Sequence, residues 1–454
     1  MSRSEDLFAA EKRPITFSEL LNQAQQYLST NYPKLLADKN SNQKKEKMLS
    51  YLRKFISDKS YAVRGIDSES LPLRLYQEMA EYSFLTPYFY NSKKNNIEGI
   101  EINAWDDITV KYAGGLQEKS AQHFQSPQQA KDIFNRLLRN SGYPPMDDAK
   151  PIARGHLGSN IRITVDSGGG TLDNDVGLCA SIRFINPNGL TKRDLVSNGT
   201  LTEEMMDLLC GIYRYGRSML LAGETDAGKT TLMSVIMSEA VPYGKKLITI
   251  EYGDREFNLV VSKDGKILNN VIHLRTKDSE DIKLVVTPQM LLEFSMTMNP
   301  DFLCMAEIRG AEAFETIEAA LTGHPVIGTV HVDCCEDIPD RLVQLASIKC
   351  SNLSDTTLYR MVTKAFPILF YEQKMEDSKR RVTDICECFI QNDKLVFNPL
   401  WVYATKYNEE RDGKTIIHGQ FKKSGTISAG LQRRLRRKGM PETMLKKITG
   451  GDGT

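Results

Sequence analysis

Residues 218 to 231 contain the glycines, the lysine and the hydroxyl residue of a phosphate-binding loop. The fixed positions of the pattern G-x-x-x-x-G-K-[ST] are filled by Gly223, Gly228, Lys229 and Thr230. Backbone N–H groups of such a loop surround the phosphates, its lysine reaches the β- and γ-phosphates, and its hydroxyl takes one position on Mg²⁺. We therefore expect a nucleotide and Mg²⁺ to bind here, through Gly223, Glu224, Thr225, Asp226, Ala227, Gly228, Lys229, Thr230 and Thr231.

The segments on both sides of this loop fit the same chemistry. Residues 219–222 form a short apolar run typical of a strand, and residues 231–239 have helical character. The strand delivers the loop, and the helix adds the positive end of its dipole. Asp226 is unusual because it is an acid inside the loop. We expect its carboxylate to point away from the phosphates.

Polar residues follow three further apolar runs, at residues 247–250, 302–306 and 326–330. Open α/β sheets bind ligands at the carboxyl ends of their strands, where Glu251, Glu307 and His331 would lie. A glutamate at the position of Glu251 can orient and deprotonate a water aimed at the γ-phosphate. Glu307 ends a run of the Walker B type. We also expect His324 to lie near the same edge as His331.

Composition and local pattern predict four parts of the chain. These are a helical N-terminal extension over 1–70, a smaller α+β domain over 71–186, an α/β domain with the phosphate loop over 187–372, and a C-terminal extension over 373–454. The turn-rich residues 186–189 are expected to be the hinge between the second and third parts. In the last part we expect a hairpin of residues 382–390 and 395–403, then a basic helix over 428–447.

The overall composition is that of a soluble globular protein. The 59 basic and 58 acidic residues nearly cancel, which gives no general attraction to nucleic acid. The sequence contains neither an apolar run long enough to span a membrane nor the apolar core of a signal peptide. Eight cysteines without a C-x-x-C pair favour reduced thiols in a cytosolic protein over disulfides or a zinc site.

The order of these motifs resembles the secretion or traffic ATPases of type II secretion, type IV secretion and type IV pili. Within that family, the chain is most similar to the CpaF type of tight-adherence (Tad) pilus systems. The similarity covers roughly residues 75 to 390. It rests on residues 299–313 for the Walker B region, 322–324 and 328–331 for the histidine motifs, and Ile250-Glu251 with Arg255-Glu256 for the Asp box.

The resemblance implies a RecA-like ATPase domain that binds ATP and Mg²⁺, joined by a hinge to a mobile N-terminal domain. It makes Glu251 the catalytic glutamate, Glu307 the acid near Mg²⁺ and His331 the sensor of the γ-phosphate. Arg162 and Arg183 best match two N-terminal arginines that complete the phosphate site. The family forms homohexamers at the cytoplasmic face of the membrane. It associates with the membrane through integral platform proteins of a pilus or secretion system, and direct binding of nucleic acid is not expected.

Some positions and functions stay open. Tyr252 stands where the family has an acid, and Asp254 is shifted by two positions, so the roles of both are unassigned. Residues 191–194 resemble a guanine-reading motif, but they precede the phosphate loop, which favours ATP over GTP. The resemblance favours an ATP-hydrolysing hexameric motor that powers pilus assembly or type II or type IV secretion. A nucleotide-gated scaffold with negligible hydrolysis and a conjugative DNA-transfer ATPase are the alternatives. Glu251 and Glu307 argue against the scaffold.

Overall fold

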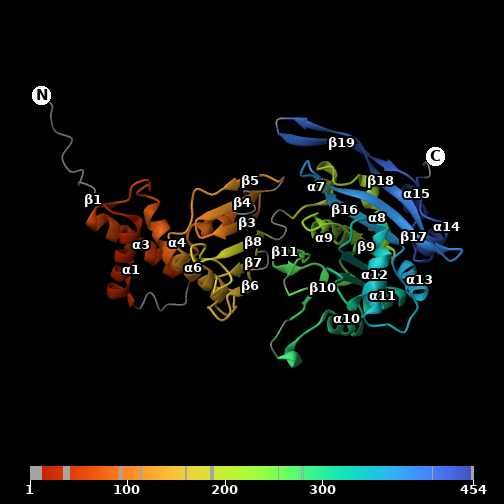
Figure 1. Ribbon diagram of the computed structural model, residues 1–454, viewed down its shortest axis with the longest axis horizontal. Helices are drawn as coiled ribbons and strands as arrows, with labels where there is room; N and C mark the ends of the chain where they lie inside the picture. The colour runs from red at the N-terminus through yellow and green to blue at the C-terminus, as the bar shows by residue number, and fades with distance from the viewer. Residues whose placement is uncertain are drawn as a thin grey trace. The chain divides into compact units, whose positions relative to one another are not determined.

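A computed structural model describes residues 13–33, 41–91, 96–112, 115–158, 161–184, 189–253, 255–277, 279, 281–411 and 413–450. The chain divides into two compact units, Met1–Pro187 and Asn188–Thr454 (Figure 1). The first three residues of the predicted hinge, 186–188, lie outside the described residues, as does Asp254. Within the described ranges, none of the helices combines the length and apolar character needed to cross a membrane.

The first unit begins with a small helical cluster. Its helices pack through apolar side chains at helical spacing, such as Leu20, Ala24 and Leu28. The predicted capping box is present, since the Thr16 side chain accepts from the Glu19 backbone and Glu19 bonds back to Thr16. The elements are β1 (Arg13–Pro14), α1 (Phe17–Asn31), α3 (Ser41–Lys59), β2 (Tyr61–Ala62) and α4 (Leu71–Ala80).

The rest of the first unit is a six-stranded antiparallel sheet in the order β5-β4-β3-β8-β7-β6. Alternate residues of its strands are buried against α6, whose apolar face includes Ile133, Phe134 and Leu137. This is the α+β arrangement that the sequence predicts. The elements are η1 (Ser83–Leu85), α5 (Thr86–Asn91), β3 (Ile97–Ala104), β4 (Asp107–Tyr112), β5 (Gln117–Lys119), α6 (Pro127–Asn140), β6 (Ile152–Leu157), β7 (Ile161–Asp166) and β8 (Cys179–Phe184).

The second unit is built on a nine-stranded sheet in the order β13-β10-β14-β15-β9-β16-β17-β18-β19. The first six strands are parallel, and the strand that leads into the phosphate loop, β9, lies between β15 and β16. This confirms the predicted RecA-like α/β fold. The strands are β9 (Met219–Ala222), β10 (Lys246–Glu251), β13 (Asn270–Arg275), β14 (Phe302–Met305), β15 (Val326–Val330), β16 (Ile368–Lys374), β17 (Arg380–Gln391), β18 (Lys394–Arg411) and β19 (Lys414–Lys423).

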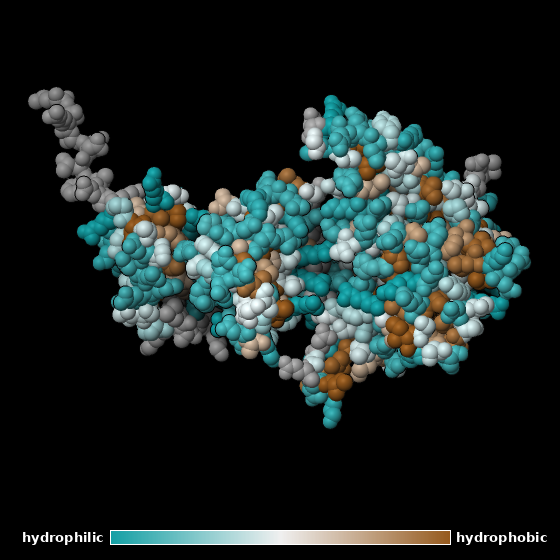
Figure 2. Space-filling model, in the orientation of Figure 1, coloured by the Kyte–Doolittle hydropathy of each residue, from teal (hydrophilic) through white to brown (hydrophobic). Residues whose placement is uncertain are grey.

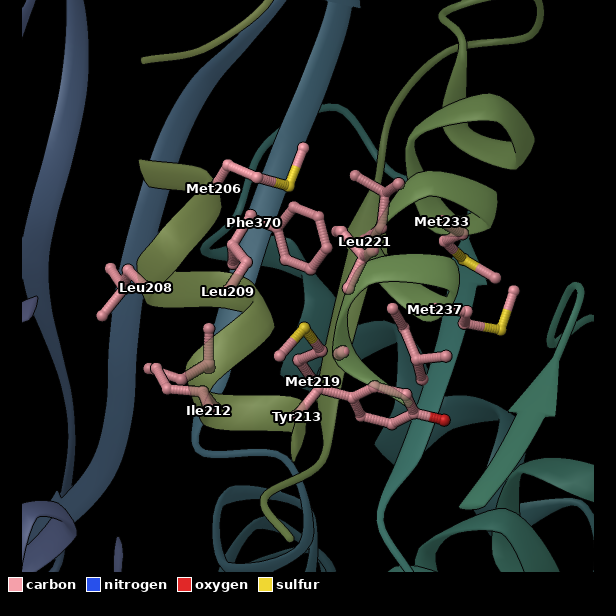
Figure 3. Close-up of a cluster of buried hydrophobic side chains, with 14 of the residues drawn as sticks. Met206, Leu208, Leu209, Ile212, Tyr213, Met219, Leu221, Met233, Met237 and Phe370 are labelled. Atoms are coloured by element: carbon pink, nitrogen blue, oxygen red, sulfur yellow. The ribbon is translucent and has the colours of Figure 1, made fainter. Parts of the chain in front are cut away.

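Helices cover both faces of this sheet, and Figure 3 shows the core on one of them. Alternate residues of β9 face the two cores, Met219 and Leu221 one core and Leu220 the other. The helices and short elements are α7 (Lys192–Ser197), α8 (Glu203–Arg214), α9 (Lys229–Ala240), β11 (Ser262–Lys263), β12 (Lys266–Ile267), η2 (Ile282–Leu284), α10 (Pro288–Thr297), α11 (Glu312–Leu321), α12 (Asp337–Ser347), α13 (Asp355–Ala365), α14 (Ala429–Arg437) and α15 (Glu442–Thr449).

The C-terminal part differs from the prediction in two ways. The predicted boundary at residue 372 falls inside β16, and the predicted hairpin, now β17 and β18, continues the same sheet through antiparallel pairing. The predicted single helix is two helices, because Gly439 adopts a positive φ of 87° and Pro441 follows it.

The visible surface is mostly hydrophilic, and apolar side chains gather in small groups (Figure 2). One group lies at the tip of the segment between β13 and α10, where Ile282 and Leu284 are exposed. All eight cysteines are free, as the sequence predicts. Among the described residues, no cluster of His, Cys, Asp and Glu could hold a metal by itself.

Candidate active site

The phosphate loop begins directly after β9, and α9 begins at Lys229. Its two motif glycines have positive φ angles, 154° at Gly223 and 109° at Gly228. A Cβ atom at Gly223 would overlap the carbonyl oxygen of Glu372, and one at Gly228 would lie 2.8 Å from both Glu372 Oε1 and Arg380 Cδ. Glycine is therefore required at both positions by backbone conformation and by the close approach of β16 and β17.

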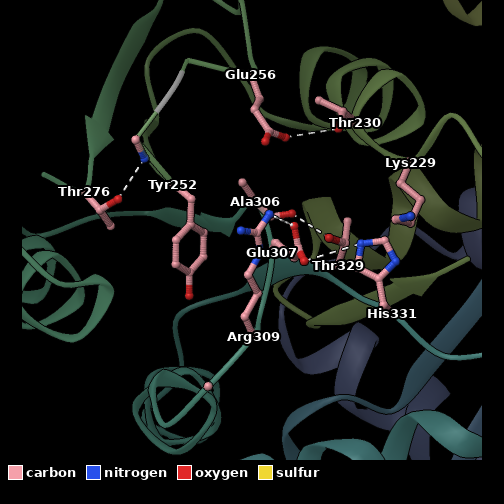
Figure 4. Close-up of polar contacts among 12 residues, drawn as sticks. Lys229, Thr230, Tyr252, Glu256, Thr276, Ala306, Glu307, Arg309, Thr329 and His331 are labelled. Atoms are coloured by element: carbon pink, nitrogen blue, oxygen red, sulfur yellow. Dashed lines mark hydrogen bonds and ion pairs between the residues drawn. The ribbon is translucent and has the colours of Figure 1, made fainter. Parts of the chain in front are cut away.

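Lys229 and Thr230, the loop residues that the motif assigns to phosphate and Mg²⁺, already have partners within the chain. Lys229 Nζ donates to the carbonyl oxygens of Gly223 (2.8 Å) and Glu224 (2.6 Å). Thr230 Oγ1 donates to Glu256 Oε2 at 3.3 Å (Figure 4). The Lys229 ammonium is thus bound by the backbone of the loop in which the motif predicts the phosphates.

Asp226 is held by basic residues from the neighbouring strands. Its φ of 65° lies in the left-handed region, which aspartate tolerates better than most residues. Its carboxylate is 3.3 Å from Lys374 Nζ and 3.2 Å from Arg380 Nη2, and Arg380 Nε also donates to its carbonyl oxygen (3.1 Å). These cations offset the acid that the sequence places inside a phosphate site.

Glu372 lies beneath the loop and is almost completely buried. Its Oε2 atom has no hydrogen-bond partner among the described residues. Burial raises the pKa of its carboxyl to about 8, although the charges of Arg380 and Lys229 oppose that shift. Glu372 therefore holds its proton at neutral pH.

A pH dependence of stability follows from this carboxyl. Between its ordinary pKa of 4.5 and about 8, the native state keeps a proton that the unfolded state releases, so stability falls as the pH rises. Glu372→Gln keeps the shape and removes this titration. We expect the variant to gain stability relative to wild type between pH 5.5 and 8.5, by up to about 1.4 kcal/mol per pH unit.

Urea unfolding of both proteins at pH 5.5, 7 and 8.5 measures this difference. Glu376→Gln is the matched control, since Glu376 is exposed in the same hairpin. A constant difference between Glu372→Gln and wild type over the whole range would contradict the prediction.

Glu251, the predicted catalytic glutamate, is completely buried at the end of β10. Its Oε1 accepts from Thr249 Oγ1 (2.5 Å) and is 3.0 Å from His273 Nδ1, while its Oε2 accepts from the backbone N–H groups of Glu256 and Phe257. Burial alone would raise the pKa of this carboxyl, but the bonds from His273, Thr249 and the Glu256 backbone lower it overall.

In this structure Glu251 holds the following loop in place, because both of its carboxylate oxygens accept hydrogen bonds from the chain. Its catalytic role stays a prediction, and the loop offers a second candidate for the base. The loop that it holds carries Glu256, the partner of Thr230. Sequence reasoning assigned no role to Glu256, although the Arg255-Glu256 pair in the predicted Asp box was the available signal.

Glu307 and His331 lie together at the carboxyl ends of β14 and β15, as predicted. Glu307 Oε1 is 3.4 Å from His331 Nε2, and Glu307 Oε2 is 2.5 Å from Arg309 Nη2 (Figure 4). Burial and the charge of Lys229 lower the pKa of His331, and Glu307 opposes them. A neutral imidazole at neutral pH can bond a phosphate oxygen or a water.

His324 does not join this group. It precedes β15, whereas His331 follows the same strand, so the two histidines lie at opposite ends of β15. The expectation that both lie near one edge is therefore wrong.

A family model described as "Type II/IV secretion system protein" matches residues 148–388, more than half of the chain. The chain belongs to this family. The type IV secretion system protein PtlH of Bordetella pertussis is 31% identical over 175 residues, which are 37% of this chain and 50% of PtlH. VirB11 of Brucella suis is 34% identical over 142 residues, 31% of this chain and 37% of VirB11.

The chain thus spans about half the length of the PtlH proteins that it matches. Among solved structures, the ATPase DotB of Legionella pneumophila is 17% identical and aligns over 66% of this chain and 78% of DotB, with a TM-score of 0.48.

The match to the type II/IV secretion family begins in the first unit and includes β7 and β8. Arg162 on β7 and Arg183 on β8 are direct cross-strand partners, so their side chains leave the same face of the sheet. Arg162 is half-buried and Arg183 is exposed. The structure therefore brings the two predicted arginines together within the first unit.

Proposed function

We propose that this member of the type II/IV secretion family is an ATP-hydrolysing motor. The observation that carries the proposal is the 3.3 Å contact between Glu256 Oε2 and Thr230 Oγ1, which places a carboxylate beside the phosphate loop. In this reading Lys229 leaves its loop carbonyls for the β- and γ-phosphates, and Glu256 accepts the proton of the attacking water. Glu307 and His331 lie together on the adjoining strand ends, where His331 would contact the γ-phosphate.

The oxygen donors at this edge fit Mg²⁺, which prefers hydroxyl, carboxylate and water oxygens. Thr230 and Glu307 would hold it. Bound there, Mg²⁺ supplies charge that stabilises the transferring phosphoryl group. ATP is the proposed nucleotide, because the guanine-like residues 191–194 begin α7 and Thr191 caps that helix, so this segment has a structural role.

The coupled process is part of the proposal. By resemblance, we propose a homohexamer of the CpaF type at the cytoplasmic face of the membrane, where integral platform proteins of a Tad or other pilus or secretion system would hold it. Conjugative DNA transfer is the second candidate, favoured by no observed contact. Purified protein that hydrolyses ATP at least tenfold faster than GTP in kcat/KM supports the proposal. Binding of ATP without hydrolysis would favour the nucleotide-gated scaffold instead of the motor.

The paired arginines give a further test. If they complete the phosphate site as the resemblance implies, Arg183→Ala should fold normally and hydrolyse ATP at least about tenfold more slowly, because an arginine at the transferring phosphate is worth roughly 10³–10⁵ in kcat. Arg139→Ala is the control, an exposed arginine on α6 of the same unit. Equal kcat in both variants would make Arg183 a surface charge.

A further inference from the structure

Arg309 is held by two different kinds of partner at once. Its Nη2 atom is 2.5 Å from Glu307 Oε2, and its guanidinium carbon lies 4.7 Å from the centre of the Tyr252 ring (Figure 4). A guanidinium at this distance from an aromatic face is attracted by the electrons of the ring. Arg309 therefore has a carboxylate on one side and a neutral cation-binding face on the other.

Glu312 fixes this arrangement from the first turn of α11. It is nearly buried, and its Oε1 accepts from Tyr252 Oη (2.5 Å), the Arg309 N–H (2.6 Å) and the Gly310 N–H (2.8 Å). Burial and the bond to Glu312 raise the pKa of Tyr252, so its hydroxyl remains a donor. One carboxylate oxygen of Glu312 thus fixes the positions of both the Tyr252 ring and the backbone that carries Arg309.

This contact has a consequence for Mg²⁺, which rests on the function proposed above. Glu307 is the acid proposed to hold Mg²⁺, yet its carboxylate already has Arg309 and His331 as partners. A cation that arrives beside Glu307 meets the guanidinium of Arg309 and is repelled by it. Arg309 must release the carboxylate before it can serve the metal, and the Tyr252 ring already holds the guanidinium from its other side.

We propose that Arg309 is the counter-ion of Glu307 until Mg²⁺ and nucleotide bind, and that Tyr252 and Glu312 are positioning residues which hold Arg309 once Glu307 releases it. This gives a role to Tyr252, the residue that stands where related chains carry an acid. An acid there would form a second ion pair with Arg309, whereas the tyrosine ring binds it more weakly and leaves it able to return.

The test measures how the affinity for a fluorescent ATP analogue depends on Mg²⁺ concentration, before any turnover. Arg309→Gln removes the competing cation and should lower the Mg²⁺ concentration for half-saturation by about threefold to tenfold, the worth of a partly exposed charge-assisted bond. Tyr252→Leu removes the receiving face and should raise that concentration. The double variant should behave like Arg309→Gln alone, because the ring acts only through Arg309.

Two controls accompany these variants. Tyr252→Phe keeps the ring but loses the bond to Glu312, and should lie between wild type and Tyr252→Leu. Arg360→Gln breaks an exposed arginine–aspartate pair of the same unit, Arg360 with Asp393 at 2.7 Å, and should leave the Mg²⁺ dependence unchanged.

The outcomes separate this inference from the proposed function. The affinity without Mg²⁺ reports on the phosphate loop alone. If the wild-type protein binds no nucleotide either with or without Mg²⁺, the proposed function and the inference are both overturned. Normal binding with shifts of the same direction in Arg309→Gln and Tyr252→Leu, or with additive shifts in the double variant, would overturn only the inference and leave these residues a structural role.

Discussion

A Lys229→Ala variant is expected to lose almost all ATP turnover. The lysine ammonium supplies the charge that contacts the β- and γ-phosphates, and no other lysine lies in the loop. Nζ also bonds the carbonyl oxygens of Gly223 and Glu224, so the substitution removes two hydrogen bonds within the loop as well. Release of phosphate by the purified protein, measured at saturating ATP, gives the result directly.

Lys245→Ala is the matched control for this experiment. Lys245 belongs to the same unit and pairs with Asp301 at 2.9 Å, at the amino end of β10 and away from the loop. It should keep wild-type turnover. Hydrolysis at the wild-type rate by Lys229→Ala would remove the motor from consideration.

The second large effect is expected at Glu256. Glu256→Gln keeps the contact with Thr230 but cannot accept a proton, so ATP should still bind while kcat falls by roughly 10²–10⁴-fold. Its melting temperature should stay close to that of wild type, because Glu256 is only partly buried. Single-turnover hydrolysis, nucleotide affinity and thermal unfolding measured together give the pattern.

Glu251→Gln is the comparison that separates the two glutamates. The amide places an N–H₂ group where one carboxylate oxygen accepts two hydrogen bonds, and buried donors left without acceptors cost about 1–3 kcal/mol. We therefore expect a clear fall in melting temperature for Glu251→Gln. A normal kcat in Glu256→Gln, with a stable but inactive Glu251→Gln, would return the general base to Glu251.

The sequence predicted the strands and the loop of the phosphate site well. The loop between β9 and α9 and the strands that end at Glu251 and His331 are where pattern and spacing placed them. Apolar runs followed by polar residues are reliable because parallel buried strands end at one edge of the sheet.

The burial of Glu251, which spacing did not predict, has a reason in local geometry. Side chains alternate along β10, and Thr249 and Glu251 turn to the side where His273 and the loop after the strand provide donors. Whether a strand-end acid meets solvent or the chain's own N–H groups depends on the path of residues 252–257. Spacing alone does not show this path.

The C-terminal boundary failed because antiparallel continuation leaves no local signal. β16 lies beside β9 and pairs in the same sheet with β17, but the turn between these strands looks like the start of a separate extension. The two basic residues of this hairpin that hold Asp226, Lys374 and Arg380, likewise show their role only in three dimensions.

The position of β9 in the sheet also affects how the chain reaches its fold. Both of its neighbours, β15 and β16, are encoded more than 100 residues after it, so during synthesis the strand that carries the phosphate loop emerges long before either partner. Until β16 leaves the ribosome, the backbone N–H and C=O groups along one edge of β9 stay unpaired, and closing these loops makes folding slow and exposed to aggregation. The nucleotide site is therefore among the last parts of the second unit to form.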